Sequence, residues 1–287
     1  MTSLTRTTGR LEAHRRFIDR ALDRLLPAGG RGAAGRIREA MRYCVLSGGK
    51  GRGTDVQRPK RVRPLLCLGG CEAVGSPARR ALPAACSVEL IHAYSLVHDD
   101  LPAMDDAMMR RGRPSCHRKF GEGNAILVGD ALLTLAFELL GRDGTANSLG
   151  IIATLGRACG TVGLIGGQAL DLEVITRARA TNAMALRDVA RRKTAALITA
   201  SLVAGGLAGG ATAAQRARLE RYGKDLGLAF QLIDDVHDHD GLARALGAEA
   251  AAREARRLIG RAVETLTPFG RRAETLRALA ATLASTI

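Results

Sequence analysis

The sequence predicts an all-α protein, and three features of its 287 residues support that prediction. Aromatic residues make up only 3% of the chain, tryptophan is absent, and alanine, leucine and arginine dominate, a mixture that favours helix over strand. Apolar residues recur at helical spacing almost everywhere, between glycine and proline breaks. No run of β-branched residues alternates with period two, so we expect no sheet.

The helical pattern divides the chain into ten segments. We expect helices at residues 8–26, 33–47, 63–73, 79–100, 123–141, 146–175, 183–208, 212–238, 242–267 and 271–285. The one obvious non-helical interruption is a stretch rich in glycine and cations at residues 47–64. Because 46% of the residues are apolar, the chain can bury a sizeable core, and we expect a single domain spanning residues 1–287.

The composition also limits the partners and the compartment. A net charge of +15 suits nucleic acid, an anionic membrane or a phosphorylated small molecule, although a GC-rich genome also produces such a composition. We expect no nucleic-acid partner, because the chain has no recognised binding motif and few aromatic side chains for stacking. The six cysteines form no C-x-x-C pair and are typical of reduced, buried thiols in a cytoplasmic protein.

The N-terminal residues 1–30 have the pattern of an ordinary amphipathic helix and lack an apolar signal core. No uninterrupted apolar stretch reaches the ~18 residues that a transmembrane helix needs. We therefore expect a cytoplasmic protein without a transmembrane segment.

Two apolar helices are each expected to end in a cluster of aspartates. The clusters are Asp99, Asp100, Asp105 and Asp106 in "HDDLPAMDD", and Asp234, Asp235 and Asp238 in "IDDVHD", about 135 residues later. Carboxylates at a helix C-terminus oppose the helix dipole and repel one another, so they favour a divalent cation, and hard oxygen donors select Mg²⁺ or Ca²⁺. One such pair alone would more often be a solvated turn, but the repetition favours a metal site.

Basic residues follow the first cluster and recur later in the chain. Arg110 and Arg111 come within a few residues of the aspartates, and Lys193 lies in "RRKTAALI". Arginine binds phosphate through two parallel hydrogen bonds, and lysine acts as a point charge. If the two acidic helices face each other, Mg²⁺ would bridge their carboxylates to a pyrophosphate, and the apolar helices beneath would accept a hydrocarbon.

At this point the chain resembles a known family, the trans-isoprenyl diphosphate synthases, most closely the bacterial farnesyl diphosphate synthases. The resemblance runs from about residue 33 to 270 and rests on blocks in the family order: "MRYCVLSGGK", "RVRPLL", "VELIHAYSLVHDDLPAMDD", "RRGRPSCHRKFGEGNAILVGDALLTLAFELL", "GGQALDLE", "RRKTAALI" and "YGKDLGLAFQLIDDVHD". It implies an all-α bundle of about ten or more helices around a deep central cavity, acting as a homodimer.

The resemblance also implies a role for each site residue. Asp99 and Asp105, supported by Asp100, would bind two Mg²⁺ ions, and Asp234, assisted by Asp235 and Asp238, would bind a third. Arg110 and Lys193 would hold the allylic diphosphate, and Lys60, Arg63, His92 and Arg111 would hold isopentenyl diphosphate. Thr194, Gln231 and Gln168 would flank the developing carbocation. The implied reaction ionises the allylic diphosphate, joins the cation to the isopentenyl double bond and releases a proton without a protein nucleophile.

Tyr94 bears on the length of the product. It lies five residues before Asp99, about 7.5 Å along a helix, where a bulky ring would block a growing chain. In the family, an aromatic residue near this position and two extra residues in the first motif accompany a C15 product, so farnesyl diphosphate is predicted. A C10 or C20 product, with Tyr94 acting only in core packing, stays open.

The sequence departs from the family pattern in two places. An inserted loop at residues 48–60 separates Lys50 from Arg61, so either Lys50 or Lys60 would meet isopentenyl diphosphate; we favour Lys60 because its spacing from Arg63 is preserved. After Asp238 the chain lacks a loop of roughly twenty residues whose lysines would hold the diphosphate, and a charged hydrogen bond contributes ~1.5–3 kcal/mol. A weakly active or inactive paralogue acting as a partner subunit is therefore the main alternative. A class I terpene cyclase would normally carry a different second motif.

Overall fold

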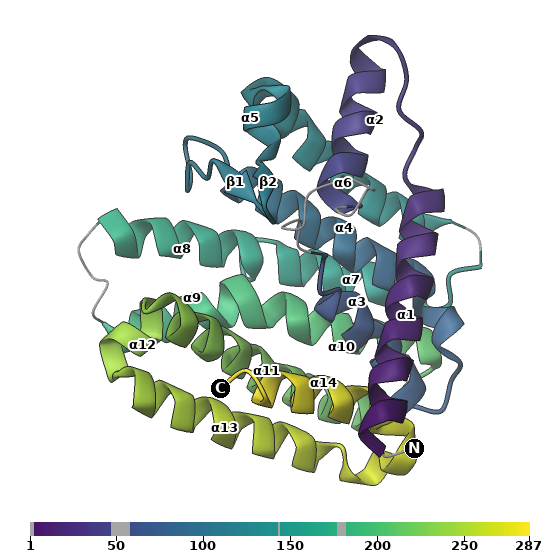
Figure 1. Cartoon of the computed structure of the whole chain (residues 1–287). Coiled ribbons are helices and arrows are strands. Elements are labelled where there is room, and N and C mark those ends of the chain that lie inside the picture. The colour runs from purple at the N-terminus through teal and green to yellow at the C-terminus, as the bar shows by residue number, and fades with distance from the viewer. Residues whose placement is uncertain (1–2, 47–57, 143, 177–181) are drawn as a thin grey trace.

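The computed structural model describes residues 3–46, 58–142, 144–176 and 182–287. Its regular elements are almost all helical, which confirms the predicted all-α fold (Figure 1). They are α1 (Ser3–Leu25), α2 (Gly32–Val45), α3 (Val62–Ala73), η1 (Ala78–Ala81), α4 (Leu82–Asp99), β1 (Met109–Arg110), β2 (Arg113–Pro114), α5 (Cys116–Phe120), α6 (Glu122–Gly141), α7 (Ser148–Cys159), α8 (Leu164–Thr176), α9 (Ala183–Val189), η2 (Ala190–Ala195), α10 (Ala196–Gly209), α11 (Ala213–Asp238), α12 (Gly241–Leu246), α13 (Ala248–Thr265), η3 (Thr267–Ala273) and α14 (Glu274–Ala284).

Helix α10 lies at the centre of the bundle. Its sequence, ALITASLVAGGLAG, is apolar on every side, as expected for a helix surrounded by others, and nearly all of its residues are buried. It packs against α3, α7 and α11, while α4 packs along α6 and α11 along α13. In Figure 1, α8, α10 and α13 run across the view, and α1 runs upright beside them. One hydrophobic core continues from α1 to α14.

The structure differs from the predicted helices in several places. The predicted helix 146–175 is divided into α7 and α8 because Gly160 ends α7 in an extended conformation. The predicted helix 183–208 includes a π-helical turn, η2, between α9 and α10. The predicted segment 242–267 is a short α12 followed by α13, with Gly247 between them at φ +87°.

The expectation of no sheet was wrong for one short hairpin. Strands β1 and β2 pair in antiparallel fashion, with Arg110 opposite Arg113. The two residues between them, Arg111 and Gly112, have φ values of +53° and +74°, as a tight type I′ hairpin turn requires. The sequence signal for this hairpin was therefore only the single glycine after two arginines.

Three further expectations concern the rest of the chain. All six cysteines are free thiols, as predicted. The predicted inserted loop 48–60 and Lys50 lie outside the described residues, apart from positions 58–60. Two helical stretches, Glu122–Gly141 and Ser148–Val174, are long and apolar enough to span a membrane by length and composition alone, although charged residues interrupt both. This is weak evidence for a span, since 44% of the first window is buried inside the protein and the second is divided between α7 and α8.

Candidate active site

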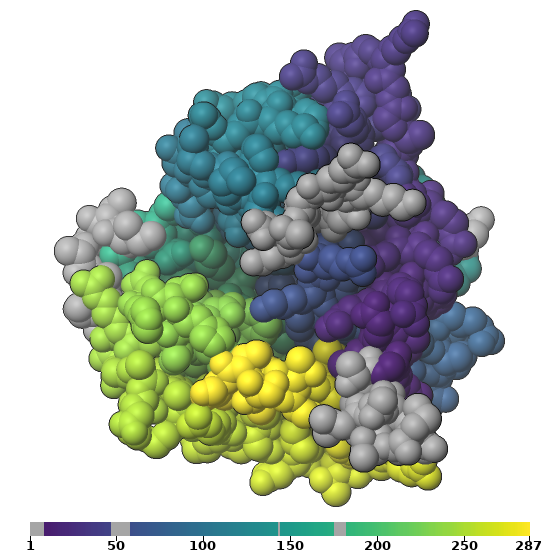
Figure 2. Space-filling model, in the orientation of Figure 1, coloured from purple at the N-terminus to yellow at the C-terminus, as the bar shows by residue number. Residues whose placement is uncertain are grey.

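A cavity of about 430 Å³ opens where α3, α4, the β hairpin, α8, η2 and α11 meet. Figure 2 shows the surface hollowed between the hairpin region, the start of α3 and the C-terminal half of the chain. Ten of the residues predicted from the sequence line this cavity: Lys60, Arg63, His92, Asp99, Arg110, Arg111, Gln168, Lys193, Thr194 and Asp234. Residues more than 170 positions apart in the sequence therefore converge on one space.

The other predicted site residues do not line the cavity. They are Tyr94, Asp100, Asp105, Gln231, Asp235 and Asp238. Asp105 and Asp238 are exposed, at the ends of the segments that carry Asp99 and Asp234. Tyr94 is buried in the body of α4, 5% exposed, with its ring edge-to-face against His98 at 5.9 Å.

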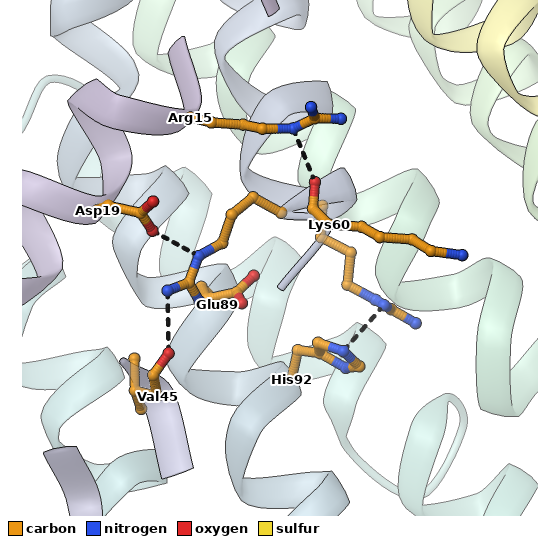
Figure 3. Close-up of polar contacts among 8 residues, drawn as sticks. Arg15, Asp19, Val45, Lys60, Glu89 and His92 are labelled. Carbon is orange, nitrogen blue, oxygen red and sulfur yellow. Dashed lines mark hydrogen bonds and ion pairs between the residues drawn. The ribbon is translucent and has the colours of Figure 1, made fainter. Parts of the chain in front are cut away.

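A buried arginine, Arg61, fixes the start of α3 and with it the neighbouring cations. Its backbone is left-handed, at φ +52°, and its guanidinium donates to Asp19 Oδ1 at 2.9 Å and to the carbonyl of Val45 at 2.9 Å, beside Glu89 (Figure 3). Figure 3 shows the side chain of Lys60 extending away from Asp19 and Val45. Because Arg61 is held by α1, α2 and α4, Lys60 and Arg63 are presented on the opposite side, toward the cavity.

Arg63 and His92 form a polar pair from α3 and α4. Arg63 Nη1 lies 3.4 Å from His92 Nε2. Burial and the nearby charges of Arg63, Arg111 and Arg110 hold the pKa of His92 well below its usual range. The imidazole is therefore neutral at pH 7 and accepts a hydrogen bond from the guanidinium. The positive charge of this cavity wall is carried by the arginines around it.

Asp99 and Asp234 bring negative charge into the same cavity from two different helices. Burial and neighbouring carboxylates raise the pKa of Asp99 to about 6, partly offset by Lys193. Burial likewise raises the pKa of Asp234 to about 6, partly offset by Lys60. Carboxylates crowded in this way bind a proton or a cation more readily than free aspartates do.

The donors present suit Mg²⁺. Asp99 and Asp234 offer hard carboxylate oxygens, and within the described residues no group of three or more His, Cys, Asp or Glu side chains closes a metal site by itself. Mg²⁺ usually takes only one or two protein carboxylates and completes its shell with waters and substrate phosphates. An open pair of acidic walls facing lysines and arginines therefore fits a metal shared with a bound diphosphate.

Asp100 is turned away from the cavity and holds Arg110. The carboxylate is 2% exposed and accepts from Arg110 Nε at 3.0 and 3.2 Å, and from a terminal nitrogen of the same guanidinium. The hairpin turn at Arg111 and Gly112 folds this segment back over α4. In this structure Asp100 thus orients an arginine rather than presenting its oxygens to the cavity.

The π-helical turn η2 carries Lys193 and Thr194 into the cavity, and polar contacts hold both. Lys193 Nζ donates to Asp171 Oδ2 at 2.7 Å. Thr194 Oγ1 donates to Gln231 Oε1 at 2.6 Å, and Gln231 Nε2 donates in turn to Asp235 Oδ1 at 2.7 Å. Wide π turns of this kind occur frequently at functional sites.

The same relay ends at the shortened segment after α11. Asp235 Oδ2 accepts from the backbone N–H of Leu242 at 2.7 Å, in the first turn of α12. The carboxylate is 8% exposed. Asp235 therefore holds α12 directly against the end of α11, at the place where the family pattern has a longer loop that this sequence lacks.

Glycine lets the neighbouring helix approach η2 closely. A Cβ at Gly167 of α8 would lie 2.3 Å from the backbone nitrogen of Lys193. Close approach of α8 brings Gln168 to the cavity beside Lys193 and Thr194, and the buried Oε1 of Gln168 has no hydrogen-bond partner in the described part of the chain. An unpartnered buried acceptor in a cavity is the type of group that a ligand or bound water satisfies.

Sequence reasoning missed several residues that shape the site. Arg61, Glu89 and Asp171 carry the ion pairs that fix its cations. The spacing Gln168-x-x-Asp171 places both on one helical face and was the available signal for the partner of Lys193. Nothing in the local sequence indicated that Arg61, rather than Lys60 or Arg63, is the cation whose side chain forms buried ion pairs.

Comparisons with known proteins agree with this geometry. A sequence profile of the polyprenyl synthetase family matches residues 36–252. The chain is 42% identical over 240 residues to geranylgeranyl pyrophosphate synthase 12, chloroplastic, of Arabidopsis thaliana, which covers 78% of this chain and 63% of that protein. The chain thus spans about three fifths of the length of this curated relative. It belongs to the polyprenyl synthetase family.

Solved structures extend the similarity over nearly the whole chain. An FPP/GFPP synthase from Zymomonas mobilis, in its apo form, superposes with a TM-score of 0.89 at 35% identity and covers 98% of this chain and 99% of its own. A geranyltransferase from Legionella pneumophila gives a TM-score of 0.86 at 31% identity and covers 99% and 98%. These matches confirm the family resemblance that the sequence blocks indicated.

Proposed function

We propose that this protein is a Mg²⁺-dependent prenyltransferase that condenses isopentenyl diphosphate with an allylic diphosphate to a short-chain prenyl diphosphate. The observation that carries the proposal is the convergence of Asp99 and Asp234 with five basic side chains around one cavity: Lys60, Arg63, Arg110, Arg111 and Lys193. Acidic and basic walls are both needed if a diphosphate is to be held through metal on one side and directly on the other. Membership of the polyprenyl synthetase family supports the same chemistry.

The allylic diphosphate would bind between the acidic residues and the cations Arg110 and Lys193. Asp99 and Asp105, and Asp234 with help from Asp238, would hold Mg²⁺, which would neutralise charge on the departing pyrophosphate. We expect three Mg²⁺ ions in the site. Arg110, oriented by Asp100, and Lys193, oriented by Asp171, would add hydrogen bonds that strengthen as negative charge develops on the leaving group. The chain therefore contributes positioned charge rather than a nucleophile.

Isopentenyl diphosphate would occupy the cationic wall formed by Lys60, Arg63 and Arg111, with neutral His92 beside them. Burial lowers the pKa of Arg63 and of Arg111, so a second anion relieves the cost of confining these charges. Lys60 lines the cavity, which supports our choice of this residue over Lys50.

The carbocation formed on ionisation would lie against Thr194 and Gln168, which line the cavity, and Gln231 would act from behind Thr194. The Thr194 hydroxyl donates its hydrogen bond to Gln231, which leaves lone pairs of the threonine oxygen free toward positive charge, and Gln168 Oε1 has no competing partner in the described structure. Oxygen dipoles of this kind stabilise a cation without reacting with it. Loss of a proton to the departing pyrophosphate would complete the reaction.

The product length is proposed as C15 with C20 an equal alternative. The buried ring of Tyr94 supports a short chain, because it lies on the helix that ends in Asp99. The printed names of the curated relatives favour geranylgeranyl diphosphate, and the Zymomonas protein is an FPP/GFPP synthase. A C10 product is the remaining possibility on the same grounds.

The alternative function is a weakly active or inactive partner subunit. The direct contact of α12 with Asp235 favours it, since a carboxylate occupied by a backbone N–H is less free to assist a metal. We propose a homodimer of single catalytic domains spanning residues 1–287 as the working assembly, with exposed apolar side chains such as Ile126, Leu127 and Leu149 available for a contact. Action in the cytoplasm stays a prediction, since the named plant relatives are chloroplastic.

A steady-state assay separates the two functions. Pyrophosphate release from isopentenyl diphosphate and geranyl diphosphate is measured over a Mg²⁺ titration. The proposal expects turnover that depends on both substrates and on Mg²⁺. Absence of turnover at high enzyme concentration would assign the chain to the partner-subunit class.

A further inference from the structure

A second, larger cavity of about 870 Å³ lies on the other side of η2 from the candidate active site. Its walls come from the C-terminal end of α7, from α9 and η2, and from α10, α11 and α13. It shares no lining residue with the active-site cavity. Its size lies within the ~300–1,000 Å³ that binding pockets for small molecules occupy.

The floor of this second cavity is apolar. Ala195, Ala200, Val203, Leu228 and Leu258 line it, each between 3% and 7% exposed. These residues keep a little contact with solvent, as expected of side chains at the bottom of a depression. One polar group accompanies them: Thr199 Oγ1 is buried and has no hydrogen-bond partner in the described residues.

The rim of the cavity is strongly basic. Seven basic and three acidic side chains line it. The acids are already paired: Glu254 accepts from Arg187 at 2.7 Å, Asp225 from Arg261 at 2.6 Å, and Glu220 lies 2.7 Å from Lys224. The acids therefore neutralise only part of the positive charge.

Three arginines of the rim keep their full charge. Arg157 of α7, Arg191 of η2 and Arg216 of α11 are exposed and have no carboxylate within ion-pair distance in the described part of the chain. Cations from three separate elements that face one cavity repel one another, and an anion bound among them removes that repulsion. Guanidinium groups also hold phosphate oxygens in pairs.

We propose that this second cavity, defined by Arg157, Arg191 and Arg216 above an apolar floor, binds a soluble single-chain amphiphile with a phosphate or diphosphate head. The head group lies among the three arginines, and the hydrocarbon tail covers Ala200, Val203 and Leu258. A purely polar anion would leave the floor exposed, and an uncharged hydrocarbon would leave the arginines unpaired. Only a molecule with both parts matches both surfaces.

The position of η2 gives this binding a consequence. Arg191 and Ala195 of this turn face the second cavity, while Lys193 and Thr194 of the same turn face the active-site cavity. A head group held by Arg191 restrains the turn that carries Lys193 and Thr194. An amphiphile in the second cavity is therefore expected to change the affinity of the active site for its own ligands, by coupling through a shared element.

The test is direct binding without catalysis, so that it stands apart from the proposed activity. Radiolabelled dodecyl phosphate, below its micelle concentration, is equilibrated with the full-length protein in EDTA. The triple variant Arg157→Ala, Arg191→Ala, Arg216→Ala is expected to bind dodecyl phosphate at least about tenfold more weakly than wild type does. The matched control is Arg218→Ala, which removes an exposed arginine of α11 outside the cavity and is expected to bind normally.

Further arms separate head from tail and small molecule from membrane. Inorganic phosphate, which has no tail, is expected to compete at least tenfold less well than dodecyl phosphate, and farnesyl diphosphate to compete well. Ala196→Phe, which fills the apolar side of the cavity, is expected to weaken dodecyl phosphate but not inorganic phosphate. Thermal unfolding confirms that each variant is folded.

Three results would overturn the proposal. The first is equal binding of dodecyl phosphate by wild type and the triple variant. The second is binding only to vesicles of anionic phospholipid, with no saturable uptake of the monomer. The third is a change in sedimentation coefficient of the triple variant, which would make the cavity an interface between two copies of the chain.

Discussion

The carboxylate of Asp100 lies 3.0 Å from Nε of Arg110, and this pair joins the end of α4 to the β hairpin. Asp100 is almost fully buried, whereas the Arg110 side chain is 39% exposed, so the acid is the fixed partner and the arginine the one being oriented. The first acidic cluster thus contains two kinds of aspartate. Asp99 faces the cavity, and Asp100 supports a cation that faces the same cavity.

Asp100→Asn tests this division. The amide keeps one acceptor oxygen, loses the second and carries no charge, so Arg110 is held less firmly. We expect KM for the allylic diphosphate to rise about tenfold, because one charge-assisted hydrogen bond to the substrate is weakened. KM for isopentenyl diphosphate serves as the internal control and should stay within twofold. An equal rise for both substrates would mean that Asp100 acts on the whole site.

Gly167→Ala tests the close approach of α8 to η2. The added Cβ would lie 2.3 Å from Lys193 N, so the two elements must separate. We expect a loss of about 1–3 kcal/mol in the free energy of unfolding, together with a lower kcat as Lys193 and Gln168 move apart. Gly156→Ala on α7 is the matched control, because a Cβ there meets open space. Unchanged kcat and stability in Gly167→Ala would contradict the packing described here.

Glu72 predicts a pH dependence of stability. Burial alone would raise its pKa, but contacts with His14, Thr275 and Arg10 lower the pKa below its usual value. A carboxyl with a lowered pKa in the folded state stabilises the fold above the unfolded pKa of about 4.3 and loses that contribution as pH falls through the folded pKa. Glu72→Gln should therefore cost about 1.5–3 kcal/mol at pH 7 and progressively less below pH ~4.

Chemical denaturation of wild type and Glu72→Gln over this pH range measures the effect. Glu264→Gln, an exposed site on α13, is the control and should stay within about 0.5 kcal/mol of wild type throughout. A difference between wild type and Glu72→Gln that is constant with pH would show that Glu72 stabilises the fold by packing and not by charge.

Tyr94 predicts a change in product length. Tyr94→Ala removes a buried ring from the helix that ends in Asp99, so a longer chain gains room and the product should lengthen by at least one C5 unit. Tyr94→Phe is the matched control: Tyr94 Oη has no hydrogen-bond partner in the described structure, so its loss should leave the product unchanged. Chromatography of dephosphorylated products measures both. An unchanged product from Tyr94→Ala would refute the role of the ring as a floor.

The sequence predicted most of the fold because helical periodicity is a local signal. It also predicted the acidic residues Asp99 and Asp234, since their clusters follow apolar helices in one continuous stretch each. It could not predict that Asp100 points away from the cavity or that Asp235 binds α12, because both outcomes depend on partners, Arg110 and Leu242, placed by tertiary packing. The π turn and the left-handed Arg61 were hidden for the same reason.

Analysis of the prenyl product tests the central claim most directly. Wild type is incubated with isopentenyl diphosphate and geranyl diphosphate, with Mg²⁺ or with EDTA, beside the isosteric variants Asp99→Asn and Asp234→Asn. We predict a C15 or longer product from wild type with Mg²⁺ only, and a loss of at least 100-fold in each variant, roughly what removal of one transition-state contact costs. A prenyl product formed equally well in EDTA, or undiminished by either variant, would contradict the account.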